Sequence, residues 1–282
     1  MFTNPNLLDE IDTKQASIEE NPEFYVALQN RIESNFDNYS KIYSWMIEHP
    51  DIRRGLLKED IDSATRGKLI SRAREGIKNL REAWKYLRVL KDPFNDGTLK
   101  TLATIIEPDF NMTPNFRQDR VSLNMQEYTP PNPLRVPELI SQAFFDLKNN
   151  ECHPVEKAAK AHLYIAGIQP FNNGNKRLAR LMQDKILLDA NLPPATIPSG
   201  EREAYIDILE NALSGWNSMR NGSAFSYDLK RKSMNNQRPF FDYIAGKVNS
   251  ALDHIVGDLN LFRIRKQNQQ SVYPIHNLLR QH

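Results

Sequence analysis

The chain has 282 residues, of which 26% are charged, and its formal net charge at pH 7 is +2. This length suffices for one large domain or two small ones, and so balanced a charge gives no electrostatic reason to expect a nucleic-acid or membrane partner. The single cysteine, Cys152, excludes an internal disulfide framework and fits a reducing compartment. We see no signal-peptide pattern and no apolar run of about 20 residues, so the expected location is the cytoplasm.

Apolar residues at helical spacing dominate the first third of the chain. One such pattern runs from Pro22 to Glu48, and a second runs from about Lys58 to Leu90. The segment 91–97 that follows is rich in Pro, Asn, Asp and Gly, which is typical of a linker. Residues 1–92 are therefore predicted to form an N-terminal helical region.

A short segment in the middle of the chain has a different period. Val121, Leu123 and Met125 alternate with polar neighbours, which predicts a short strand or hairpin within Phe116–Tyr128. The proline-rich run 129–133 must be a loop, because proline can continue neither a helix nor a central strand. Helical patterns then resume over Val136–Asn149, His153–Ile168, Lys176–Asn191, Glu201–Trp216 and Pro239–Leu259. The fold class predicted from these patterns is mainly α.

The segment Gln169–Arg180, with the sequence QPFNNGNKRLAR, predicts a phosphate site. Gly174 allows the backbone to approach a ligand closely, and the start of the helix after it offers free N–H groups and a positive dipole to an anion. Arg177 and Arg180 are three residues apart on that helix, so both guanidinium groups can reach the same phosphate chain.

The same segment resembles the signature of the Fic family, His-x-Phe-x-(Asp/Glu/Asn)-Gly-Asn-x-Arg-x-x-Arg. The residues that match at the family's spacing are Phe171, Gly174, Asn175, Arg177 and Arg180. Asn173 is an acceptable variant at the metal-side position, whereas Gln169 stands where the family has its catalytic histidine. The resemblance implies a Fic-type helical bundle with its core over residues 93–216, a β-hairpin flap over the nucleotide site, and a C-terminal helical extension over residues 217–282.

The resemblance also implies an activity, protein adenylylation. In the family, a hydroxyl of a target protein attacks the α-phosphate of ATP, with Mg²⁺ present, and AMP moves to the target. The residues that would bind the nucleotide are Phe171, Gly174, Asn175, Lys176, Arg177 and Arg180, with Asn173 near the metal. The flap residues Val121, Leu123 and Met125 would align the target segment by strand-like pairing. The target protein itself cannot be deduced, and a homodimer, common in relatives, is a further expectation.

A second pattern lies upstream. Ser71-Arg72-Ala73-Arg74-Glu75-Gly76 fits the family's inhibitory pattern (Ser/Thr)-x-x-x-Glu-(Gly/Asn). The resemblance implies that Glu75 pairs with Arg180 and excludes the γ-phosphate, because a carboxylate and a triphosphate compete for one guanidinium group. This places the chain in the subclass with an N-terminal inhibitory helix. From the residues alone, the same helix face could simply be solvated.

Gln169 limits how far the activity can be carried over. A glutamine can orient a hydroxyl but cannot deprotonate it near neutral pH, and general-base catalysis contributes about 10²–10⁴-fold. We therefore expect the protein to retain nucleotide binding even where catalysis is lost. Two other groups could act as a base: His162, for which a packed core position is the commoner role, and Glu75, in a reverse reaction that removes AMP.

Several functions remain open from the sequence. The first is an adenylyltransferase-like protein that is autoinhibited by Glu75 and impaired at Gln169. The second is a nucleotide-binding pseudoenzyme with a regulatory or scaffold role, and the third is an AMP-removing Fic protein. The last is an interaction protein in which the phosphate loop is merely structural.

Overall fold

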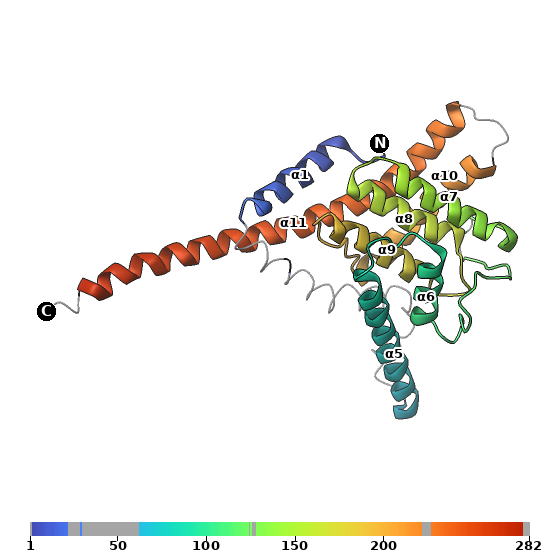
Figure 1. Cartoon of the computed structure of the whole chain (residues 1–282), viewed down its shortest axis with the longest axis horizontal. Helices are drawn as coiled ribbons and strands as arrows, with labels where there is room; N and C mark the ends of the chain where they lie inside the picture. The colour runs from blue at the N-terminus through green and yellow to red at the C-terminus, as the bar shows by residue number, and fades with distance from the viewer. Residues whose placement is uncertain are drawn as a thin grey trace.

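The computed structural model describes residues 2–21, 29, 62–123, 125, 128–221 and 227–278. Its helices, labelled as in Figure 1, are α1 (Pro5–Glu19), α5 (Ser63–Arg88), α6 (Asp96–Ile106), α7 (Val136–Asn149), α8 (Pro154–Ile168), α9 (Asn175–Asp189), α10 (Arg202–Asn221) and α11 (Tyr227–Leu278), with short 3-10 turns η2 (Pro133–Arg135) and η3 (Ser199–Glu201). No strand is assigned within these ranges, and the prediction of a mainly α fold is confirmed. The pattern predicted for residues 22–48 lies almost entirely outside the described residues. The described helices include no apolar stretch of the length that a membrane span needs.

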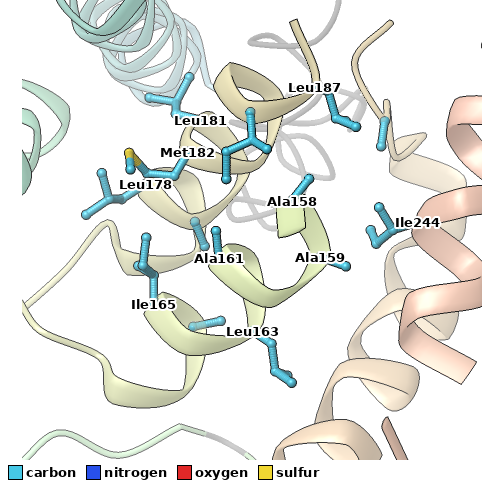
Figure 2. Close-up of a cluster of buried hydrophobic side chains, with 14 of the residues drawn as sticks. Ala158, Ala159, Ala161, Leu163, Ile165, Leu178, Leu181, Met182, Leu187 and Ile244 are labelled. Atoms are coloured by element: carbon cyan, nitrogen blue, oxygen red, sulfur yellow. The ribbon is translucent and has the colours of Figure 1, made fainter. Parts of the chain in front are cut away.

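Helix α8 lies at the centre of the helical body and contacts α7, α9, α10 and α11 (Figure 1). It is rich in alanine, and Ala158, Ala159 and Ala161 are fully buried. Small side chains allow neighbouring helices to approach closely. Figure 2 shows α8 between the apolar side chains of α9 and Ile244 of α11. The loop that joins α8 to α9 is thus held at both ends by the core.

Helix α5 joins the body only through its second half. Leu80, Trp84 and Leu87 are buried, and the helix contacts α6 and α9, whereas its first half projects away from the body (Figure 1). The next helix, α6, was not predicted. Asn95 caps it by accepting a hydrogen bond from the backbone N–H of Thr98 at 2.9 Å. The end of the predicted linker 91–97 is therefore the first turn of a helix, because an Asn-Asp-Gly run also serves as a helix start.

Helix α11 has 52 residues and is much longer than the predicted range 239–259. The predicted apolar positions are buried, which confirms their register: Phe241, Ile244, Val248, Leu252, Ile255 and Leu259. Helix α1, which was not predicted, packs along α11, and the rings of Phe2 and Phe241 stack at 4.7 Å between centroids. The C-terminal part of α11 continues away from the body (Figure 1).

The predicted hairpin within Phe116–Tyr128 is not confirmed, because the described residues of this segment contain no strand. The backbone N–H of Met125 donates to the carbonyl oxygen of Leu123 at 2.7 Å, which is a tight turn rather than an extended strand. Leu123 and Met125 are half-buried and pack against the core. Alternation of apolar residues predicts one buried face, but a strand also needs a partner for its backbone hydrogen bonds.

The close contact at Gly167, near the end of α8, generates a stability prediction. A Cβ atom there would lie 2.7 Å from Cζ3 of Trp216 and 2.9 Å from Cδ2 of Leu213, both on α10. We expect Gly167→Ala to lower the free energy of unfolding by about 1–3 kcal/mol, as overpacking of a core does. Gly246→Ala is the matched control: this glycine is also helical and has open space around it, so alanine there should be neutral or stabilise by up to about 1 kcal/mol. Urea denaturation of both variants measures the difference, and equal stabilities would contradict the close packing of α8 on α10.

Candidate functional site

The loop between α8 and α9 turns through two left-handed residues. Gln169, the C-cap of α8, has φ 50° and ψ 62°, and Gly174, the N-cap of α9, has φ 81° and ψ 0°. Glycine is needed at position 174 for a second reason, since a Cβ atom there would lie 3.0 Å from Cγ2 of Ile106 and 3.3 Å from Cγ of Glu107. The end of α6 therefore lies directly against the start of α9.

Asn175 holds the loop together. Its Oδ1 accepts from the backbone N–H of Phe171 at 2.9 Å, and its Nδ2 donates to the carbonyl oxygen of Phe171 at 2.8 Å. Asn173 closes the turn, because its Oδ1 accepts from the backbone N–H of Gly174 at 2.7 Å. The Phe171 ring is buried against Phe116, with 5.6 Å between centroids. Phe171 and Asn175, predicted to bind the nucleotide, and Asn173, predicted near the metal, thus shape the loop; their contacts with a ligand stay a prediction.

Gln169 is fully engaged within the protein. Its Nε2 donates to the carbonyl oxygen of Ala166 at 2.6 Å, and its Oε1 accepts from Nδ2 of Asn175 at 3.0 Å. Only 5% of the residue is exposed. The amide is therefore bonded to the last turn of α8 and to the first residue of α9, so this side chain stabilises the left-handed turn and is not directed at an external hydroxyl.

The predicted pair of arginines lies on the first turns of α9, and both side chains are buried. Arg177 places Nη1 2.5 Å from Oε1 of Glu107 and Nη2 3.5 Å from Oδ1 of Asn173. Lys176 is half-buried next to them. Guanidinium groups buried beside a helix N-terminus favour an anion, which is the electrostatic property expected of a phosphate site.

Arg117 is the main structural residue of the site to which the sequence assigned no role. The side chain is buried and donates from Nε to the carbonyl oxygen of Gln169 at 2.6 Å, from Nη2 to that of Pro131 at 2.6 Å and from Nη1 to that of Asp119 at 2.8 Å. Burial lowers the pKa of the guanidinium group from its usual value. Arg117 thus ties the segment after α6 to the turn at Gln169. The sequence feature that could have indicated this role is the position of Arg117 next to the aromatic residue Phe116.

The alternative bases lie elsewhere. His162 is fully buried, and its ring nitrogens contact Oε1 of Gln183 at 2.7 Å and the hydroxyl of Tyr205 at 2.9 Å. This agrees with the packed core position that is commoner for such a histidine. Glu75 and Ser71 are exposed on the projecting half of α5, and Gly76 is half-buried there.

Glu75 and Arg180 differ in exposure. Arg180 is 3% exposed, whereas Glu75 is exposed on α5. The inhibitory role of Glu75 stays a prediction, as does docking of a target at Val121, Leu123 and Met125, of which all three are half-buried.

The residues around the loop do not suit a magnesium ion held by the protein alone. Among the described residues there is no group of three His, Cys, Asp or Glu side chains that could hold a metal. Asn173 offers one neutral oxygen, which already accepts hydrogen bonds from Gly174 and Arg177. Mg²⁺ commonly binds through one or two carboxylates together with the phosphates of a substrate, and the phosphates would have to supply most ligands here.

Comparison with known proteins agrees with this geometry. A model of the Fic/DOC family matches residues 93–187. The fold is similar to a Fic domain containing signaling protein from Bacteroides thetaiotaomicron, with a TM-score of 0.66 and 19% identity over 89% of this chain and 96% of that one. It is also similar to a Fic family protein from Desulfovibrio desulfuricans, with a TM-score of 0.63 and 19% identity over 90% of this chain and 75% of that one. Residues 93–187 of the chain form a Fic domain.

The Fic domain is also similar in sequence to curated adenylyltransferases. The protein adenylyltransferase Fic of Drosophila willistoni is 36% identical over 104 residues, which are 36% of this chain and 20% of that protein. The same enzyme of Drosophila mojavensis is 40% identical over 68 residues, or 24% of this chain and 14% of that protein. The match spans a fifth or less of these relatives, so it supports a Fic domain of the adenylyltransferase type, and the activity of the whole protein is a separate question.

The contacts of Arg117 generate the prediction for this site. Arg117→Met keeps much of the side-chain volume but leaves the carbonyl oxygens of Gln169, Asp119 and Pro131 without these donors. Because a buried acceptor left unsatisfied costs about 1–3 kcal/mol, we expect a lower free energy of unfolding by about 2–4 kcal/mol. Arg120→Met is the control, since Arg120 is exposed in the same segment. Thermal unfolding followed by circular dichroism should separate the two variants clearly, and similar midpoints would show that Arg117 does not hold the loop.

Proposed function

We propose that this Fic domain protein binds ATP at the loop between α8 and α9 and is an adenylyltransferase-like protein whose transfer of AMP is impaired at Gln169. One observation supports impaired transfer: the Gln169 amide is bonded at one end to Ala166 and at the other to Asn175. The binding half is supported by the left-handed Gly174, the start of α9 and the buried cation Arg177.

The reaction explains why Gln169 would impair the transfer of AMP without preventing the binding of ATP. In AMP transfer, a hydroxyl oxygen of the target forms a new bond to the α-phosphorus of ATP, the bond from that phosphorus to the bridging oxygen breaks, and pyrophosphate leaves. The hydroxyl proton needs an acceptor during this step. The phosphate groups need only N–H donors and cations, which the start of α9 and its arginines can offer. The amide of Gln169 is too weak a base to accept this proton near neutral pH, and both of its ends are already hydrogen-bonded within the protein.

The same observation supports a second candidate, a pseudoenzyme that binds a nucleotide and acts as a regulatory or scaffold protein. In that case nucleotide binding would serve to hold one conformation of the loop rather than to provide a substrate. The AMP-removing alternative has less support, because it relies on Glu75, which is exposed on α5. A target hydroxyl would approach along the segment of Val121, Leu123 and Met125, and this docking mode and a homodimer are proposals taken from the family.

Restoring histidine tests the proposal. We expect the natural chain to bind ATP with Mg²⁺ in calorimetry but to label itself weakly or not at all with radiolabelled ATP. Gln169→His should raise labelling by about 10²-fold or more, in the range of general-base catalysis, and histidine is among the side chains that tolerate a positive φ. Asn172→His places a histidine at an exposed position of the same loop and should not raise labelling.

The outcomes are distinct. Absence of ATP binding in both the natural chain and Gln169→His would refute the nucleotide proposal. Binding without labelling, even with histidine restored, would favour the pseudoenzyme.

Inhibition by Glu75 is a proposal from the sequence pattern alone. For Glu75 to pair with Arg180, its exposed carboxylate would have to reach the buried guanidinium group on α9. The pattern predicts that Glu75→Gln tightens ATP binding severalfold, because it removes the charge that competes with the γ-phosphate. Glu82→Gln, an exposed position on the same helix, is the control. Equal affinities for the two variants would contradict inhibition by Glu75.

A further inference from the structure

A carboxylate from outside the signature motif lies at its first arginine. Glu107, the C-cap of α6, is 2.5 Å from Nη1 of Arg177 through Oε1, and the two side chains are 16% and 1% exposed. The same side chain lies against Gly174, because a Cβ atom added there would be 3.3 Å from Cγ of Glu107. The carboxylate therefore lies beside the two residues that mark the start of α9.

The position of Glu107 is fixed by the packing of α6 and by contacts of the turn that follows it. The α6 residues Leu99, Leu102 and Ile106 are buried, which sets the direction in which the helix ends. After Glu107, the side chain of Asn111 donates to the carbonyl oxygens of Ala103 at 3.1 Å and Asn173 at 3.2 Å.

A second amide joins the two segments from the other side. Nδ2 of Asn172 donates to the carbonyl oxygen of Phe110 at 3.3 Å. The turn 107–111 and the loop 169–174 are thus bonded to each other, which holds the backbone of Glu107 beside the start of α9.

Arg177 is not fully satisfied by this partner. Its Nε and Nη1 are buried and make no well-directed hydrogen bond, although Nη1 is close to the Glu107 oxygen. An arginine with two such donors would gain from an anion that offers more oxygens in better directions. A phosphate group does so, and it also carries more charge than a carboxylate.

We propose that Glu107 occupies the anion position beside Arg177 and Gly174, so that a nucleotide must displace it with a phosphate group in order to bind fully. The inference rests on the proposed nucleotide site. It differs from inhibition by Glu75 in the carboxylate, the arginine and the helix involved. Glu107 then determines specificity: a polyphosphate has enough charge to compete for Arg177, a monophosphate competes poorly, and a ligand without phosphate is insensitive to Glu107.

The test compares three ligands and three forms of the full chain. ATP with Mg²⁺, AMP and adenosine are titrated calorimetrically into the natural chain, Glu107→Gln and Asp109→Asn. Glu107→Gln keeps the side-chain length and an oxygen acceptor but removes the charge. We expect ATP to bind about tenfold or more tightly to Glu107→Gln, as the loss of a competing charge-assisted contact predicts, while the affinity for adenosine stays unchanged. Asp109→Asn removes an exposed carboxylate two residues away and should match the natural chain.

Each other outcome is decisive. If the natural chain binds ATP and Glu107→Gln binds it equally or more weakly, the inference is overturned while the nucleotide site stands; Glu107 is then a structural partner of Arg177. Equal tightening of ATP and adenosine would also overturn it. If no form binds ATP, the proposed function itself fails.

A second variant covers the case in which Glu107→Gln does not fold. Glu107→Asp keeps the charge but is one methylene shorter, so it weakens the contact with Arg177 and should tighten ATP binding to a smaller degree. Unchanged or weaker ATP binding by a folded Glu107→Asp would count against the inference.

Discussion

Close packing of α8 against α9 holds the loop on which the whole site depends. Alanines on α8 allow the two helices to approach, and Gly167 allows α10 to approach the same helix near its end. With both ends of the loop fixed in this way, six residues must reverse the chain, and they do so through left-handed backbone at Gln169 and Gly174. Asn175 then satisfies both backbone groups of Phe171, which stabilises this shape of the loop without a ligand. Preorganisation of this kind lowers the entropic cost of binding.

The residues that build this shape also limit its chemistry. The side-chain amide of Gln169 bonds to Ala166 and Asn175, and the backbone carbonyl oxygen of Gln169 accepts a hydrogen bond from Arg117. A residue so placed contributes to stability through several hydrogen bonds and is a poor candidate for a proton acceptor. In the proposed function, glutamine in place of the family's histidine exchanges a catalytic group for a structural one, while the donors and cations proposed to bind phosphate are kept. The proposal that the protein binds a nucleotide but transfers AMP poorly rests on this combination.

Electrostatics at the start of α9 gives the site a second property. Two buried arginines next to a helix N-terminus are unfavourable without anions. Glu107 supplies one such charge to Arg177 from the end of α6. The same contact that stabilises the buried cation also places a negative group where a phosphate would be bound, so stability and affinity for a nucleotide are opposed at this residue. A ligand with several charges can overcome that opposition, whereas a ligand with one charge gains little.

The sequence by itself determined the helical fold class and the register of the apolar face from Phe241 to Leu259, because both depend on residues close together in the chain. The phosphate chemistry that it predicts for Gln169–Arg180 also depends on neighbouring residues and stays a prediction. Contacts between distant segments were decided only by the tertiary structure. Arg117 and Gln169 are 52 residues apart, and the contact of Glu107 with Arg177 exists because α6 packs beside α9. The expected strand around Leu123 could not be judged locally, since a strand needs a partner, and the described residues there pack on the core instead. Periodicity determines which face of a helix is buried, but packing decides which polar groups then meet at its ends.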